Sequence, residues 1–177
     1  MLTIGHSNRP LEQFLEMLTA HGVELLVDVR TVPRSRHNPH FNKESLPEAL
    51  EAAGIGYLHM PGLGGLRHTS KHSTNTGWQN LHFRGYADYM QTAEFERHMG
   101  ELLRLEREQR VAIMCAEAVP WRCHRSLVAD ALTARGVPVS HIMSAKQANP
   151  HKLTSFARIE GTAVRYPADT LDLFADH

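Results

Sequence analysis

The chain has 177 residues, of which 42% are hydrophobic and 21% are charged, and this composition excludes disordered and collagen-like chains. Its 19 basic and 19 acidic residues give a formal net charge of zero, and no apolar run approaches the ~20 residues that span a bilayer. Two cysteines are too few for a disulfide scaffold, and no signal-like segment opens the chain. We therefore expect one domain over residues 1–177 in the reducing cytoplasm, without membrane contact.

In chain order, the first half alternates short apolar runs with amphipathic segments. The pattern predicts a strand at 3–4, a helix over 10–20, a buried strand over 25–29, a loop over 30–42, a helix over 43–53 and a strand over 55–59. A long loop rich in glycine and histidine follows over 60–82. A loop of this length in a compact domain is usually functional or mobile.

The second half repeats the alternation of helices and strands. We predict helices over 86–90, 93–109 and 122–135, and strands over 111–115 and 137–142. Strands separated by helices form parallel βαβ units. The expected fold is therefore a three-layer α/β domain of Rossmann-like topology, with about five mostly parallel strands and helices on both faces of the sheet. The glycine fingerprint of dinucleotide-binding proteins and the Walker phosphate loop are both missing from the sequence.

Polar residues follow three of the predicted strands. His6 and Ser7 follow the first strand, Asp28 and Arg30 end the second, and residues 115–125 follow the strand that ends at Cys115. Ligands of parallel sheets bind beyond the carboxyl ends of the strands. We therefore expect one pocket to be surrounded by His6, Asp28, Cys115, Glu117 and Arg125.

Each of these residues also has a purely structural interpretation. Ser7 or Asn8 would cap the following helix. Asp28 and Arg30 lie on the same face of a strand, where they would form a buried ion pair. The sequence leaves these interpretations open beside a role in ligand binding for His6, Ser7, Asp28 and Arg30.

Residues 115–126 place a cysteine at a strand end that leads through a loop into a helix. The free N–H groups of a helix start favour an anion, and Arg122 and Arg125 would help to hold it. The same field would lower the pKa of a cysteine thiol and activate it as a nucleophile. Phosphatases and sulfur transferases use this arrangement, although the phosphatase spacing Cys-x5-Arg-Ser/Thr is not met.

The candidate nucleophiles are Cys115 and Cys123. Glu117 and His124 are the candidate proton-transfer groups. The structural alternatives are a small core cysteine, an ion pair between Glu117 and a neighbouring arginine, and a loop-capping role for His124.

The net charge of zero hides an uneven distribution. Residues 29–43 and 52–87 contain no acid, and Asp130 is the only acid within 118–159. If these segments share one face, that face attracts anions. The leading hypothesis is an enzyme that binds a phosphate-bearing ligand. The alternatives are a non-catalytic nucleotide or nucleic-acid binding module and a protein-interaction domain that docks through residues 60–82.

A metal site is not expected, although the chain has 13 histidines. His68 and His72 are four residues apart, but no CxxC or HExxH motif and no acidic cluster accompanies them. The sequence identifies no cofactor and no oligomeric state.

Short signatures lie at the predicted strand ends and in the loops. They are residues 3–7, 27–30 with Pro33 and Ser35, Phe41, Gly54 and Ile55 with Tyr57, 63–65, 86–90, 114–117 and 123–125. Together, over roughly residues 2–142, they resemble the bacterial domain-of-unknown-function family 488, with no departure at these positions. The resemblance implies a compact α/β domain, and it implies no established reaction.

Overall fold

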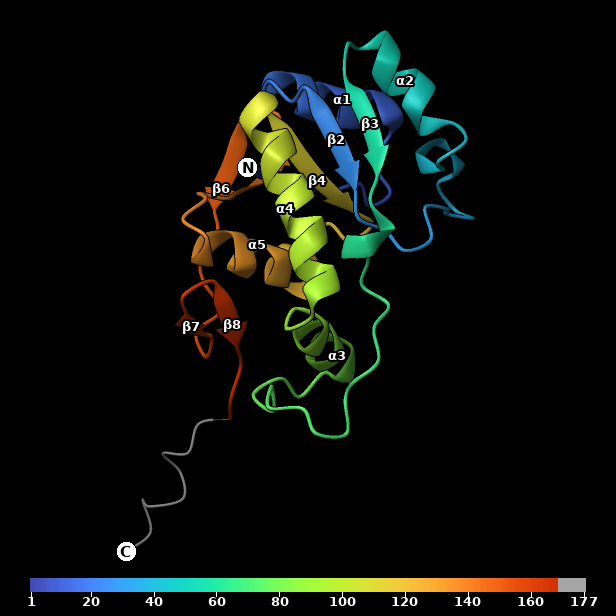
Figure 1. Ribbon diagram of the computed structural model, residues 1–177. Coiled ribbons are helices and arrows are strands. Elements are labelled where there is room, and N and C mark those ends of the chain that lie inside the picture. The colour runs from blue at the N-terminus through green and yellow to red at the C-terminus, as the bar shows by residue number, and fades with distance from the viewer. Residues whose placement is uncertain (169–177) are drawn as a thin grey trace, which may run out of the picture.

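The computed structural model describes residues 1–168, and a central sheet of six strands lies between two layers of helices (Figure 1). The strands are β1 (Leu2–Gly5), β2 (Leu25–Asp28), β3 (Gly56–His59), β4 (Val111–Cys115), β5 (Ser140–Ser144) and β6 (Gln147–Pro150). The helices are α1 (Leu11–Ala20), α2 (Leu46–Ala52), α3 (Leu81–Tyr89), α4 (Ala93–Glu108) and α5 (Arg125–Ala134). A hairpin of β7 (Arg158–Glu160) and β8 (Ala163–Arg165) packs against α5.

The strand order is β3-β2-β4-β1-β5-β6. The first five strands in this order are parallel to their neighbours, and only β6 runs antiparallel, against β5. The carboxyl ends of β1, β2 and β4 are consequently adjacent at one edge of the sheet. These are the strands that the polar residues of the sequence follow.

Two hydrophobic cores lie on the two faces of the sheet. Along β2, Leu25 and Val27 pack with α3, α4 and α5, whereas Leu26 packs with α1 and α2. This alternation follows from the two-residue period of a strand. The predicted three-layer α/β fold with a mostly parallel sheet is confirmed. Among residues 1–168, no helix is both long and apolar enough to cross a membrane.

Several predicted boundaries need correction. The helix expected over 86–90 begins at Leu81, because the Asn80 side chain accepts hydrogen bonds from the backbone N–H groups of His82 and Phe83. The long loop is therefore shorter than 60–82, and it starts with a 3-10 turn at Pro61–Leu63. The helices expected from residues 43 and 122 begin at Leu46 and Arg125.

The C-terminal part holds more strands than the sequence pattern predicted. The last predicted strand, 137–142, forms as β5 from Ser140 to Ser144, and β6, β7 and β8 were not expected. All three are short, β6 and β7 are mostly exposed and β8 buries only Val164, so they lack the apolar alternation that marks a half-buried strand. Residues 169–177 of the expected domain lie outside the described residues.

Candidate functional site

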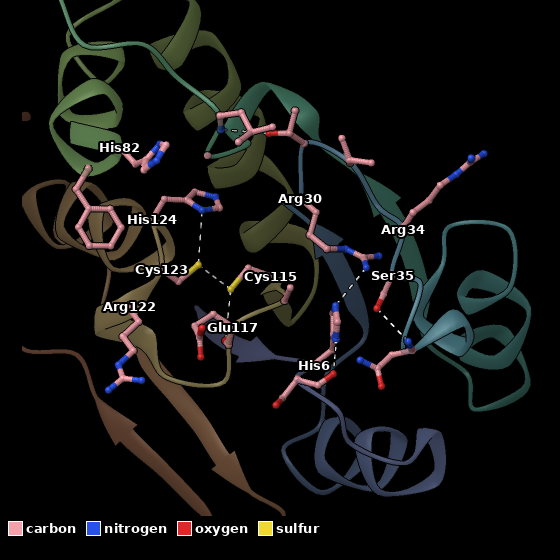
Figure 2. A pocket seen from close by; sticks show the side chains of 18 residues that line it. His6, Arg30, Arg34, Ser35, His82, Cys115, Glu117, Arg122, Cys123 and His124 are labelled. Carbon is pink, nitrogen blue, oxygen red and sulfur yellow. Dashed lines mark hydrogen bonds between the residues drawn. The ribbon is translucent and has the colours of Figure 1, made fainter. Parts of the chain in front are cut away.

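A cavity of about 630 Å³ opens at the carboxyl ends of β1, β2 and β4 (Figure 2). Eight of the ten residues proposed from the sequence line it: His6, Ser7, Arg30, Cys115, Glu117, Arg122, Cys123 and His124. The expectation that Asp28 and Arg125 also face this pocket needs correction. Both side chains are buried in contacts behind residues that do line it.

The backbone at the end of β1 sets the position of the loop that follows β4. His6 N–H donates to the Cys115 carbonyl oxygen at 3.0 Å, and Ser7 N–H donates to that of Ala116 at 2.9 Å. A Cβ atom on Gly5 would lie 1.8 Å from the Glu117 carbonyl oxygen, so only glycine permits this close crossing. Ser7 itself has φ of 50°, a left-handed conformation that is uncommon for serine.

The two cysteines lie together at the centre of the site, with His6 and Arg30 on one side and Arg122 and His82 on the other (Figure 2). The Cys123 thiol donates a hydrogen bond to the Cys115 sulfur, and the two Sγ atoms are 2.8 Å apart. The Arg125 backbone N–H, in the first turn of α5, points at the Cys123 sulfur at 3.5 Å. Both cysteines are buried but line the cavity.

The two thiols have different environments, which shift their pKa values in opposite directions. Burial alone would raise the pKa of Cys115, but the hydrogen bond from Cys123 and the charge of Arg125 outweigh it and lower the pKa. Cys123 has its pKa raised well above the ordinary value, because it donates its proton to Cys115 and because it is buried. Cys115 is therefore the better candidate for a thiolate, a choice that the sequence left open.

Arg125 is a buried cation without a carboxylate partner among residues 1–168. Its side chain is 1% exposed, and Nη2 donates to the Ala118 carbonyl oxygen at 3.1 Å. Nε and Nη1 are buried and have no hydrogen-bond partner, and no ion pair within residues 1–168 includes Arg125. Burying an uncompensated charge is costly. A thiolate at Cys115 would supply the missing negative charge.

Arg30 forms a second, compensated cation in the cavity wall. Asp28 is fully buried, and its carboxylate accepts hydrogen bonds from Arg30 Nε at 2.9 Å, Arg30 Nη2 at 2.7 Å and the Tyr57 hydroxyl at 2.5 Å. Arg30 Nη1 faces His6 Nε2 at 3.3 Å, and His6 Nδ1 donates to the Ser7 carbonyl oxygen. The ion pair thus holds the Arg30 guanidinium in the cavity wall. Arg30 therefore has both the structural contacts and the ligand-facing position that the sequence left open.

Glu117 is the only carboxylate among the residues that line the cavity. Its side chain lies near the cysteine pair in Figure 2 and is exposed. His124 Nδ1 lies 3.6 Å from the Cys123 sulfur, and burial lowers the pKa of His124 to about 4. The Nε2 atom of this neutral imidazole is buried, whereas the Glu117 side chain is exposed, so Glu117 is better placed for proton transfer.

Sequence reasoning did not single out the other half of the lining. Arg34, Ser35 and Asn38 come from the acid-free segment 29–43, and Gly65 and Leu66 come from the loop after β3. The charge distribution carried the signal, because both acid-free segments reach this cavity. Three arginines and one carboxylate line it, an excess of positive charge that attracts anions.

A second polar cluster lies on the α5 side of β5, beside a cavity of about 540 Å³. The buried Asp130 carboxylate accepts hydrogen bonds from the Thr154 and Tyr166 hydroxyls and contacts His151 Nε2 at 2.7 Å. His151 Nδ1 in turn lies 2.8 Å from His141 Nε2. The isolated acid at position 130 in an otherwise acid-free segment was the only sequence signal for this cluster. No group of three or more metal-binding side chains gathers within residues 1–168.

A family model described as a domain of unknown function, DUF488, matches residues 10–132. The match covers well over half of the chain and includes both cysteines. The chain belongs to the DUF488 family. Comparisons with curated proteins and with solved structures find no match. The DUF488 match ends inside α5, so it includes Asp130 but not His151, which contacts Asp130, or His141, which contacts His151.

Acidification is expected to destabilise this DUF488 protein. Burial lowers the pKa of His6 and of His124 to about 4, and burial together with the charge of His151 lowers that of His141 to about 3. Below the ordinary value of about 6.5, the unfolded chain binds protons that the folded chain does not bind. Each histidine then costs up to about 1.4 kcal/mol per pH unit, until its folded pKa is reached.

Urea unfolding at about pH 7 and about pH 5 measures this effect. The midpoint should fall at the lower pH, and His68→Gln, a change in an exposed loop, should keep the full difference. An equal midpoint at both pH values would contradict the assignment of neutral, buried imidazoles.

Proposed function

We propose that this protein is an enzyme that binds a small phosphate-bearing anion in the cavity and attacks it with the Cys115 thiolate. The observation that carries the proposal is the buried Arg125 guanidinium, which has no carboxylate partner in the described part of the chain and adds to the hydrogen bond from Cys123 in lowering the pKa of Cys115. A nearby anion offsets the cost of burying such a cation, and a thiolate in its field is activated as a nucleophile.

The cationic lining would attract and orient the substrate. Arg30 is held rigidly by Asp28, while Arg34 and Arg122 are longer-reaching, exposed cations at the mouth. One guanidinium group can donate two parallel hydrogen bonds to two oxygens of a phosphate, which fixes the orientation of the bound phosphate. The first turn of α5 begins directly after the lining residues Cys123 and His124 and adds its partial positive charge.

In the reaction we propose, the Cys115 sulfur forms a bond to the phosphorus atom while the bond from phosphorus to the leaving oxygen breaks. The leaving oxygen takes a proton through the Glu117 carboxyl group. A water molecule then attacks the phosphorus atom, Glu117 takes the proton from this water, and the sulfur–phosphorus bond breaks to restore the thiolate. The spacing of residues differs from the phosphatase motif, so the proposal depends on this geometry and not on a motif.

Alkylation of the two cysteines, followed by peptide mapping across a range of pH, tests the proposal. Cys115 should react faster than Cys123, with an apparent pKa below the ordinary value of about 8.5. Inorganic phosphate should protect Cys115, and Arg122→Ala should weaken this protection. Arg104→Ala, which removes an exposed arginine from α4, is the matched control and should leave protection intact. A Cys115 that is inert at neutral pH, or indifferent to phosphate, would refute the proposal.

The alternative is a non-catalytic module that binds a nucleotide or nucleic acid. Val32 and Leu66 line the cavity and are 60% and 67% exposed, so they offer apolar contacts beside Arg34. Steep salt dependence of oligonucleotide binding, with an unreactive Cys115, would favour this alternative. For either function we place the protein in the cytoplasm, where reducing conditions keep both thiols free.

A further inference from the structure

The cysteine pair has a geometry that a single nucleophile does not require. Cys115 ends β4 and Cys123 immediately precedes the N-cap of α5, and the intervening loop brings their Sγ atoms to 2.8 Å. This separation is within about 1 Å of the bond length of a disulfide, which is about 2.05 Å. Both side chains line the cavity, so a small oxidant can reach them.

We propose that Cys115 and Cys123 form a reversible disulfide after a hydroperoxide oxidises Cys115, and that this bond switches the site off. The chain has no other cysteine, so no other thiol of the same molecule competes for Cys115. Disulfides in reducing compartments are usually transient and serve catalysis or redox sensing. Formation of the bond needs only the observed proximity and a reactive Cys115, and it does not depend on phosphoryl transfer.

The chemistry proceeds in two steps that consume one hydroperoxide. The Cys115 sulfur attacks one peroxide oxygen, a sulfur–oxygen bond forms, the oxygen–oxygen bond breaks, and the departing alkoxide or hydroxide takes a proton. Cys123 then loses its proton and its sulfur attacks the Cys115 sulfur. The sulfur–sulfur bond forms, the sulfur–oxygen bond breaks, and hydroxide leaves as water with that proton. The two thiols lose two electrons in total, and the peroxide gains them.

The buried Arg125 makes this disulfide easy to reduce. Oxidation removes the negative charge of Cys115 and leaves the guanidinium without a counter-charge. A disulfide whose reduced form is stabilised in this way is a stronger oxidant than a structural disulfide. This part of the inference depends on the Cys115 thiolate of the proposed function. It makes the bond a switch rather than a permanent cross-link.

Peroxide treatment of the full chain, followed by alkylation and mass mapping of peptides without reductant, tests the inference. The expected product is one intramolecular cross-link between the two cysteine peptides, in a monomeric chain, with the loss of two hydrogen atoms. Glutathione should restore both free thiols. If both cysteines remain alkylatable after peroxide, or if they cross-link only between molecules, the inference is wrong.

Two serine variants assign the roles. Cys123→Ser should let Cys115 accumulate as a sulfenic acid that dimedone traps, whereas Cys115→Ser should leave Cys123 as an unoxidised thiol. Equal over-oxidation of Cys115 in the unaltered chain and in Cys123→Ser would overturn the resolving role of Cys123. The unaltered chain alone decides whether the disulfide forms, so the test stands even where a variant fails to fold.

Phosphate protection separates this inference from the proposed function. If the disulfide forms but phosphate does not protect Cys115, the proposed phosphate-bearing substrate is wrong and the disulfide switch stands. If phosphate protects Cys115 but no disulfide forms, the proposed substrate stands and the disulfide switch is wrong.

Discussion

Replacing Arg125 with methionine should stabilise the protein and at the same time make Cys115 much less reactive. The guanidinium is 1% exposed and has no carboxylate partner among residues 1–168, so its removal relieves the cost of a buried charge. We expect the free energy of unfolding to rise by about 1 kcal/mol. The same change removes a charge that lowers the pKa of Cys115.

The reactivity should fall, because a higher pKa of Cys115 leaves a smaller fraction of it as thiolate at neutral pH. Alkylation rates of Cys115 at neutral pH, together with urea unfolding, measure both effects. Arg125→Lys keeps the charge and should retain most of the reactivity, although it loses the planar group. If Arg125→Met lowers stability and leaves the reactivity unchanged, Arg125 is a packing residue and the proposed thiolate loses its main support.

Replacing Asp28 with asparagine should cost about 3–5 kcal/mol of stability, because it leaves Arg30 buried without its counter-charge. The carboxylate is fully buried, Arg30 is 6% exposed, and four hydrogen bonds converge on the two carboxylate oxygens. Urea unfolding measures the cost. The double variant Asp28→Leu with Arg30→Met should recover much of the loss, since it removes both charges together.

A matched control is the ion pair of Glu44 with Arg34. Both side chains are exposed, at 60% and 71%, so Glu44→Gln should change stability by less than about 1 kcal/mol. A loss of similar size at both positions would show that burial does not set the strength of the Asp28 pair. A small loss of stability in Asp28→Asn would show that other contacts compensate the Arg30 charge. The Arg30 guanidinium also contacts His6 and the Phe41 carbonyl oxygen.

The layers of the fold and the edge of the sheet that carries the site could be predicted from the sequence. Helices and strands could be predicted because apolar periodicity is a property of short segments. The rule that ligands bind beyond the carboxyl ends of parallel strands then selected His6, Arg30 and Cys115. The strand order could not be predicted, because pairing depends on packing between segments far apart in the chain. The strands β6, β7 and β8 were not predicted because each has only three or four residues, too few to show an apolar alternation.

Within the site, residue identity could be predicted better than residue role. The sequence placed both cysteines near one helix start, but only the path of the loop between them brings Sγ to Sγ and shows which thiol donates to the other. Likewise, Asp28 and Arg125 were expected to line the pocket, but both are buried behind its lining, and that burial depends on tertiary packing. Because it is buried, Asp28 holds Arg30 in position, and Arg125 acts on the site through its charge near Cys115.

The position of β1 in the sheet imposes an order on how the chain can assemble. Leu2 pairs with Ala112 on one side and with Ser140 on the other, so β1 lies between two strands that come later in the chain. By contrast, β2 and β3 pair with each other across a much shorter stretch of chain. Contacts between distant segments slow folding, and the unpaired edges of a waiting strand are open to wrong partners. During synthesis β1 therefore cannot pair with β4 before residue 115 has been made, and its other edge stays unpaired until β5 follows. His6 and Ser7 reach the cysteine loop only after β4 has been made.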